Sequence, residues 1–240
     1  MLTLIIILVV SFAFFAQSVL GFGGGLISIP ILSLFMPVQD VVSMIMIYQF
    51  AMGILIFKTY KDIHWQSIKA MLPATLIGVG IGITLLNILN ADVMRGILAA
   101  YILLHLARKY TSFDPMKKLI LWGDAHLAGL LGGLLNAMMG GGGPAFILYL
   151  KDHAIQSSAF RASIIAMLMI SNIPRAVGAV STGLLTWDLF VLSLYAFPPF
   201  LLMLYLGQKY HDKIPQKAFF IAVELLLALS AVLLIGKIVL

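Results

Sequence analysis

The chain has 240 residues, of which 62% are hydrophobic and only 10% are charged. So few charges cannot cover the surface of a soluble domain of this length, so the composition excludes a soluble protein and indicates an integral membrane protein. The net charge of +6 predicts basic cytoplasmic loops and no nucleic-acid partner, because the chain offers no soluble basic face. The chain has no cysteine, which excludes disulfides and thiolate chemistry.

Ten apolar runs follow one another along the chain, at residues 2–20, 26–36, 41–57, 70–89, 93–107, 119–139, 144–150, 162–181, 189–206 and 218–236. The runs are continuously apolar without alternation, so they predict an all-α integral membrane protein and not a barrel. The first run lacks a basic start and a cleavage site, and we expect it to stay in the mature chain. The runs at 26–36 and 144–150 are shorter than the roughly 20 residues of a membrane-spanning helix. Both follow a glycine cluster.

The two glycine clusters relate the halves of the chain to each other. Three glycines in each half match at an offset of 118 residues: Gly23, Gly24 and Gly25 with Gly141, Gly142 and Gly143. Trp65 and Trp187, which each open an apolar run, match at an offset of 122 residues. The sequence therefore predicts a first membrane repeat over 1–110, a linker over 111–117 and a second repeat over 118–240. One broken membrane segment per repeat is typical of transporters that bind substrate between the repeats.

The basic residues favour one membrane topology. If each glycine break turns the chain back as a hairpin, twelve Lys and Arg side chains share one side and only Arg95 and Lys237 lie on the other. If each broken stretch crosses the membrane once, the basic residues divide almost evenly. The positive-inside rule favours the first arrangement, with two inverted repeats that each contain a glycine-tipped hairpin and three transmembrane helices. Both termini then lie outside the cytoplasm, and the glycine tips meet near the midplane. Four full crossings per repeat are the alternative.

The glycine clusters are the first candidate site. Glycine permits tight bends and close helix packing, which is the plain interpretation of such clusters. Because both clusters precede a short helix at equivalent places, we expect the free N–H groups of each first turn, with the helix dipole, to bind a small anion. The candidate glycines are Gly23, Gly24, Gly25, Gly141, Gly142 and Gly143.

Polar residues within the apolar runs form the rest of the candidate site. Arg175 is the only Lys or Arg deep inside an apolar run, so it must either pair with an acid, for which Glu224 is the candidate, or face a polar cavity that binds the anion. Glu224 is also a candidate for proton coupling. Four further side chains either form interhelical hydrogen bonds or contact the ligand: Gln17, Ser18, Gln49 and Asn136. Asn172 is also a candidate contact, because it precedes Arg175 where Pro174 loosens the helix. The histidines show no metal-ligand spacing, and we expect no metal.

The glycine motifs resemble those of a known family. The motif G-x-G-G-G-x-x-x-x-P over residues 21–30 and its partner GGGGPAFILYL over residues 140–150 resemble the sulfite exporter TauE/SafE family, also called the toluene sulfonate uptake permease group. The resemblance extends over essentially the whole chain. It implies a secondary carrier of sulfur-containing anions such as sulfite, sulfoacetate or other organosulfonates. The second motif has Pro144 at the place of Leu26, so the two tips need not contribute equally.

These observations favour a secondary anion transporter that works by alternating access. We expect no ATP site or other cofactor, because the chain has no Walker motif. An intramembrane enzyme is one alternative, but it would need a nucleophile motif or metal spacing that the sequence lacks. A membrane assembly or accessory factor is another, although the short loops leave little room for a partner. The expected partners are a small anion and the lipid bilayer of a cell membrane, and the abundant apolar surface leaves a homodimer open.

Overall fold

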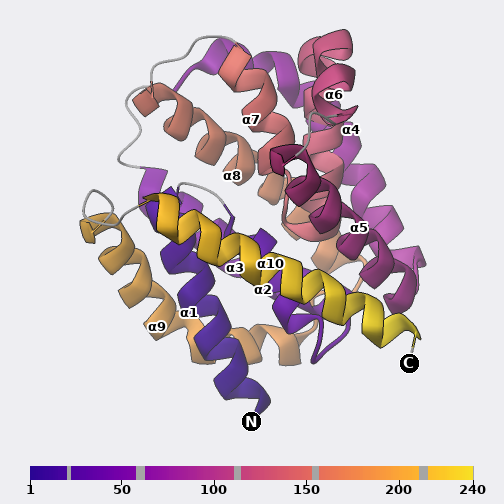
Figure 1. Ribbon diagram of the computed structural model, residues 1–240, viewed down its shortest axis with the longest axis vertical. Helices are drawn as coiled ribbons and strands as arrows, with labels where there is room; N and C mark the ends of the chain where they lie inside the picture. Colours follow the sequence, from indigo (N-terminus) through magenta and orange to yellow (C-terminus); the bar gives the residue numbers. More distant parts are fainter. Residues whose placement is uncertain (21–22, 58–62, 111–114, 153–156, 211–215, 240) are drawn as a thin grey trace.

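The computed structural model describes residues 1–20, 23–57, 63–110, 115–152, 157–210 and 216–239, and this part of the chain forms helices without a strand (Figure 1). The helices are α1 (Leu2–Leu20), α2 (Gly24–Leu32), α3 (Val38–Phe57), α4 (Trp65–Ile88), α5 (Ala91–Tyr110), α6 (Pro115–Met139), α7 (Gly143–Asp152), α8 (Ser157–Ser181), α9 (Trp187–Tyr210) and α10 (Gln216–Val239). The predicted all-α fold is confirmed. Residues 111–114 of the predicted linker lie outside the described residues, and α6 begins at Pro115, a favourable residue for a first helical position.

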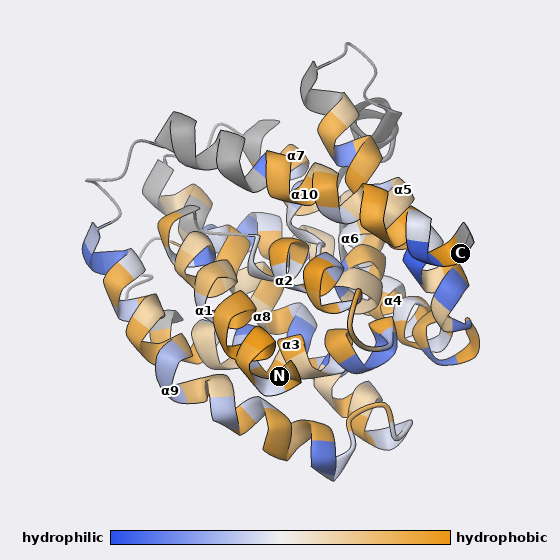
Figure 2. Ribbon diagram, turned by 60° about the horizontal axis from the view of Figure 1, so that its bottom comes forward, coloured by the Kyte–Doolittle hydropathy of each residue, from blue (hydrophilic) through white to orange (hydrophobic). Residues whose placement is uncertain are grey.

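Five of the described helices are long and apolar enough to cross a membrane, at Leu2–Val19, Val38–Leu55, Trp65–Ile88, Ala162–Ser181 and Trp187–Tyr210. Figure 2 shows that α9, for example, consists largely of hydrophobic residues between its ends. Large apolar side chains such as Leu8 and Val177 are 61% and 66% exposed. Lipid is a favourable environment for these apolar side chains. The backbone is also compatible with lipid, because each helix satisfies its own backbone hydrogen bonds. The protein is therefore a multi-pass membrane protein.

The helices α2 and α7 are the products of the two glycine breaks. They have 9 and 10 residues, too few to cross the hydrocarbon core at about 1.5 Å per residue. Gly23 precedes α2 with a φ of 105°, and Gly140 precedes α7 with a φ of 57°. Side chains disfavour this left-handed backbone, so glycine is required at both turns. The two predicted interruptions of apolar segments are confirmed.

Helices from the two halves of the chain pack against each other reciprocally. The fourth helix, α4, packs along α6, and α9 packs along α1. In the same way α3 packs against α8 and α5 against α10. Each half has a long helix, a short helix and then three more long helices. The third helices of the two halves pack together, as do the fifth helices, and the first helix of each half packs against the fourth helix of the other half. Both termini lie at the lower end of the molecule in Figure 1.

Glycines line the contact between α4 and α6. The pairs Gly78 with Gly82 and Gly129 with Gly133 are each four residues apart, so each pair lies on one helix face. A Cβ at any of the four would come within about 3 Å of a backbone carbonyl oxygen of the facing helix. Small residues at this spacing let two membrane helices approach closely. This glycine seam holds the end of α6, and hence the second break, against α4.

Candidate functional site

The two glycine breaks meet inside the protein. A Cβ at Gly25, in the first turn of α2, would lie 2.5 Å from the carbonyl oxygen of Gly140, just after α6. Ile29 of α2 also faces this break, since its Cδ1 would lie 2.8 Å from a Cβ at Gly140. Gly24, Gly25 and residues 140–143 are buried, whereas Gly23 is partly exposed. Backbone from the two halves of the chain is therefore in direct contact at this point.

A buried polar network surrounds Arg175 of α8. Its Nη1 donates hydrogen bonds to Oε1 of Gln49, at 2.8 Å, and to Oδ1 of Asn172, at 3.2 Å. Its Nη2 donates to the carbonyl oxygen of Val42, at 2.9 Å. The Arg175 side chain is only 2% exposed, and all three acceptors are neutral. Among the described residues, no carboxylate lies within ion-pair distance of the guanidinium. Within the described part of the chain, its charge is therefore solvated by amide and carbonyl dipoles.

Among the described residues, no ion pair joins Arg175 to Glu224, the acid that the sequence offered as an alternative partner. Arg175 lies on α8, which packs against α3 and α4, whereas Glu224 lies on α10, which packs against α5 and α2. Proton coupling by Glu224 stays a prediction.

Two glutamines bond directly to the glycine breaks. Oε1 of Gln17 accepts a hydrogen bond of 2.9 Å from the N–H of Gly24, so it satisfies one of the first-turn donors that lack a partner within the helix. Nε2 of Gln49 donates a bond of 3.1 Å to the carbonyl oxygen of Gly140. The amide of Gln49 therefore joins Arg175 to the second break.

Asn136, at the end of α6, extends the network. Its Nδ2 donates to Oγ of Ser171, at 2.9 Å, and to Oδ1 of Asn172, at 3.0 Å. Because Arg175 has only donors, the oxygen of Asn172 must face it, and this fixes the amide nitrogen of Asn136 toward Asn172. The Oδ1 of Asn136 is then buried without a hydrogen-bond partner in the described part of the chain. Buried acceptors of this kind are rare.

Ser18, the sequence equivalent of Asn136, faces another way. Its hydroxyl donates to the carbonyl oxygen of Leu204 on α9, at 2.9 Å. A Cβ at Gly207 of α9 would lie 2.6 Å from the Cβ of Ser18. This contact supports the plain interpretation of Ser18 as an interhelical packing residue.

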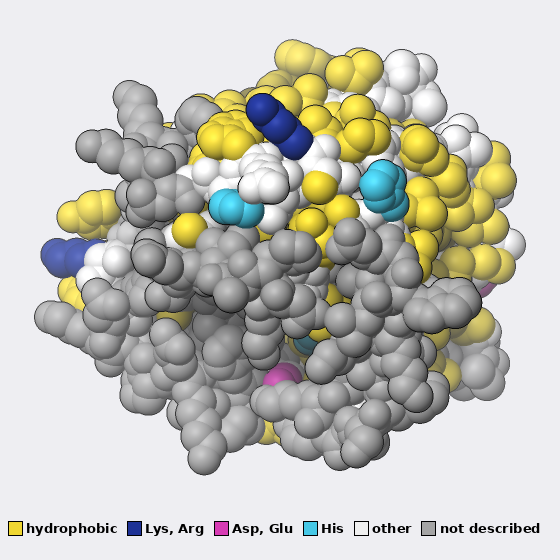
Figure 3. Space-filling view, turned by 90° about the horizontal axis from the view of Figure 1, so that it is seen from above, with side chains coloured by type: hydrophobic (Ala, Val, Ile, Leu, Met, Phe, Trp, Pro, Cys, Tyr) yellow, Lys and Arg dark blue, Asp and Glu magenta, His cyan; other side chains and the backbone are white. Residues whose placement is uncertain are grey.

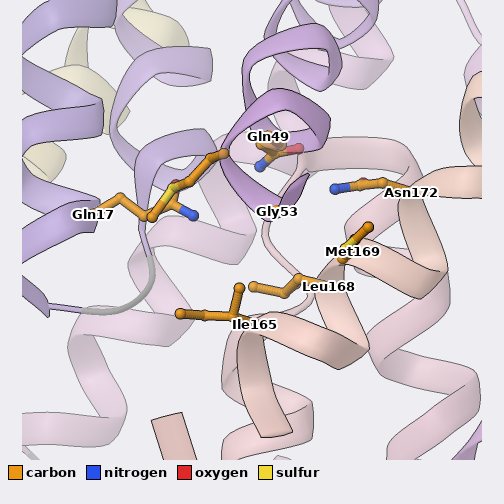
Figure 4. Close-up of a pocket in the computed structure, with 8 residues that line it drawn as sticks. Gln17, Gln49, Gly53, Ile165, Leu168, Met169 and Asn172 are labelled. Atoms are coloured by element: carbon orange, nitrogen blue, oxygen red, sulfur yellow. The ribbon is translucent and has the colours of Figure 1, made fainter. Parts of the chain in front are cut away.

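A small pocket opens among the amide groups (Figure 4). In that view the side chains of Gln17, Gln49 and Asn172 come from different helices toward a common space. The cavity volume is about 10 Å³, close to the minimum that holds one water molecule. In this conformation the side chains therefore nearly close the space between the amide groups. Its lining residues are Gln17, Gln49, Met52, Gly53, Ile165, Leu168, Met169 and Asn172.

The sequence analysis missed Tyr101 of α5. Its hydroxyl donates to the carbonyl oxygen of Gly141, at 2.5 Å, and a Cβ at Gly141 would lie 3.0 Å from its ring. A tyrosine within an apolar run does not by itself indicate such a contact, because tyrosine is also enriched where membrane helices reach the membrane–water interface.

Comparison with protein-family models matches residues 6–234 to the family described as sulfite exporter TauE/SafE. The match includes both glycine breaks, the pocket and Arg175. No curated protein and no solved structure matches the chain. Since the family match extends over nearly the full length, the chain belongs to the sulfite exporter TauE/SafE family.

Proposed function

We propose that the protein is a secondary transporter that moves a small sulfur-containing anion, such as sulfite, sulfoacetate or another organosulfonate, across the cell membrane by alternating access. Family membership implies membrane transport of sulfite or a related anion. The observation that carries the finer proposal is Arg175, a cation that is 2% exposed and hydrogen-bonded to neutral oxygens.

A charge in this position needs an anion. Removing an ion from water costs several kcal/mol even after the surroundings relax, and neutral dipoles offset only part of that cost. A bound anion restores neutrality where the described residues supply no carboxylate. The planar guanidinium also presents paired N–H groups that match two oxygens of one oxoanion.

The glycine tips are the second part of the proposed site. The first-turn N–H groups of a helix have no partner within the helix, and the helix dipole makes this end attractive to anions. Gln49 connects the tips to Arg175 through its bonds to both Gly140 and the guanidinium. The proposed substrate contacts are Gly23, Gly24, Gly25, Gly141, Gly142, Gly143, Gln17, Asn136, Asn172 and Arg175, and Gln49 lines the same site.

The test of this function is the thermal stability of the purified protein with a panel of anions. Sulfite, sulfoacetate and methanesulfonate are compared with chloride at equal ionic strength. Because a ligand that binds only the folded protein stabilises it by mass action, about 2.7 kcal/mol at 100 times Kd, at least one sulfur anion is expected to raise Tm with saturation. Uptake of that anion into proteoliposomes then tests transport. Equal Tm values for all sulfur anions and chloride would contradict the proposal.

We also propose that residues 1–110 and 118–240 are inverted repeats with both termini outside the cytoplasm. The reciprocal packing of α4 on α6 and of α9 on α1 supports the repeats. The upper face, opposite the termini, carries Lys or Arg and His side chains (Figure 3). Basic residues at that face support its cytoplasmic location.

Two cysteines on one helix test the orientation. Gln66 and Asn87 are exposed and lie near opposite ends of α4, and the chain has no other cysteine. With an impermeant thiol reagent on intact cells, Asn87→Cys is expected to react and Gln66→Cys to be protected until the cells are permeabilised. The reverse pattern would overturn the proposed orientation.

A further inference from the structure

Gln49 lies where the buried cation and the two glycine breaks come together. Its Oε1 accepts from Nη1 of Arg175, at 2.8 Å, and its Nε2 donates to the carbonyl oxygen of Gly140, at 3.1 Å. A Cβ at Gly25 would lie 2.5 Å from the same Nε2. One side-chain amide thus contacts the charged group and both breaks, and it also lines the pocket.

The amide oxygen of Gln49 occupies a donor that an anion would use. The Nη1 of arginine carries two hydrogens, and both are engaged, one by Gln49 and one by Asn172. Asn172 shares α8 with Arg175 and is held in place by Asn136. Gln49 comes from α3, so it is the acceptor that can leave without disturbing α8.

We propose that Gln49 is an internal surrogate ligand, which holds the guanidinium of Arg175 in the anion-free protein and is displaced by the substrate anion. This inference rests on the proposed anion site at Arg175. The bond from the guanidinium to Gln49 is already charge-assisted, but an oxoanion adds the Coulomb attraction of a full opposite charge, so it outcompetes a neutral amide oxygen. When the amide leaves Arg175, its bond to Gly140 loses its fixed geometry. Anion binding is thereby linked to the hydrogen bond by which Gln49 joins α3 to the second break at Gly140.

Two substitutions at Gln49 separate the surrogate from a direct ligand. Gln49→Glu keeps the size of the side chain but places a permanent carboxylate on the guanidinium. It is expected to raise the Tm of the anion-free protein and to abolish the sulfite-dependent rise. Gln49→Leu removes the competing acceptor and is expected to lower the apparent Kd for sulfite about 2- to 10-fold, the range that one hydrogen bond of ordinary net strength represents.

Gln39 provides the matched control on the same helix. Its Nε2 donates to the carbonyl oxygen of Leu89, at 2.8 Å, and it makes no bond to Arg175. Gln39→Glu and Gln39→Leu are expected to keep the wild-type response to sulfite. Sulfite titrations of Tm and equilibrium binding on all four variants give the readout.

The outcomes distinguish this inference from the proposed function. If wild-type protein responds to none of the sulfur anions, the anion site itself is wrong. If wild type responds but Gln49→Leu binds sulfite more weakly, Gln49 is a direct ligand and the surrogate role is overturned. Unchanged affinity in Gln49→Leu, meaning that the anion uses other N–H groups of Arg175, overturns it as well. Should Gln49→Leu not fold, the isosteric Gln49→Glu decides, because a retained sulfite response in that variant contradicts displacement.

Discussion

Replacing Arg175 with Ala is expected to remove the sulfite-dependent rise in Tm and to weaken anion binding by about 30-fold to several thousand-fold. This range corresponds to the roughly 2–5 kcal/mol lost when one partner of a buried, hydrogen-bonded charge pair is truncated. Arg175→Lys keeps the charge but not the planar fork that holds two oxygens at once, so an intermediate affinity is expected. Calorimetric titration of the purified variants with sulfite is the measurement.

A second arginine serves as the control for that experiment. Arg95 pairs with Asp92 at 2.5 Å, and the Asp92 side chain is 64% exposed. Exposed ion pairs contribute about 0–1 kcal/mol, so Arg95→Ala should bind sulfite as wild type does. Wild-type affinity in folded Arg175→Ala protein would show that the buried charge is not part of the anion site.

Gly142→Ala is expected to destabilise the fold. A Cβ at this position would press on the carbonyl oxygen of Gly132 and lie 2.7 Å from the Cβ of Asn136. Since the contact is with backbone of α6, relief requires α7 to move away from α6. Overpacking of this kind costs about 1–3 kcal/mol. Thermal unfolding of the purified protein in detergent should show a lower Tm.

Gly80→Ala is the control, because a Cβ at Gly80 would meet nothing within 4 Å. Alanine favours the helix over glycine by about 1 kcal/mol, so this variant should be as stable as wild type or slightly more stable. A Gly142→Ala protein with unchanged Tm would mean that the second break has room for a side chain, and the close contact of α6 and α7 would be wrong.

Local sequence signals were sufficient for the elements and the breaks. Trp65 and Trp187 each open a helix of 24 residues, and the glycine clusters lie where α2 and α7 begin. These features depend on the length of the hydrophobic runs and on the backbone freedom of glycine. Both are local properties that can be read from neighbouring residues in the sequence.

The partners within the site could not be predicted in this way. Gln49 and Arg175 are 126 residues apart, and their contact exists because α3 packs against α8. The sequence could not decide between an anion and Glu224 as the partner of Arg175 for the same reason: an apolar run indicates the depth of a charge in the membrane but not which helix faces it. Tyr101 was missed because its partner is a backbone carbonyl, which no side-chain pattern reveals.

The glycine seam between α4 and α6 also bears on which parts of the protein can move as units. Backbones in direct contact shift together, because separating them would open a void in a dense interior. The seam therefore fastens the second break to a helix of the first half, while Ser18 and Gly207 fasten α1, with the first break, to α9 of the second half. For the proposed alternating access, we expect two rigid bodies, α4 with α6 and α1 with α9. Each body contains helices from both halves of the chain, so we expect relative motion between these two bodies and not between the two halves.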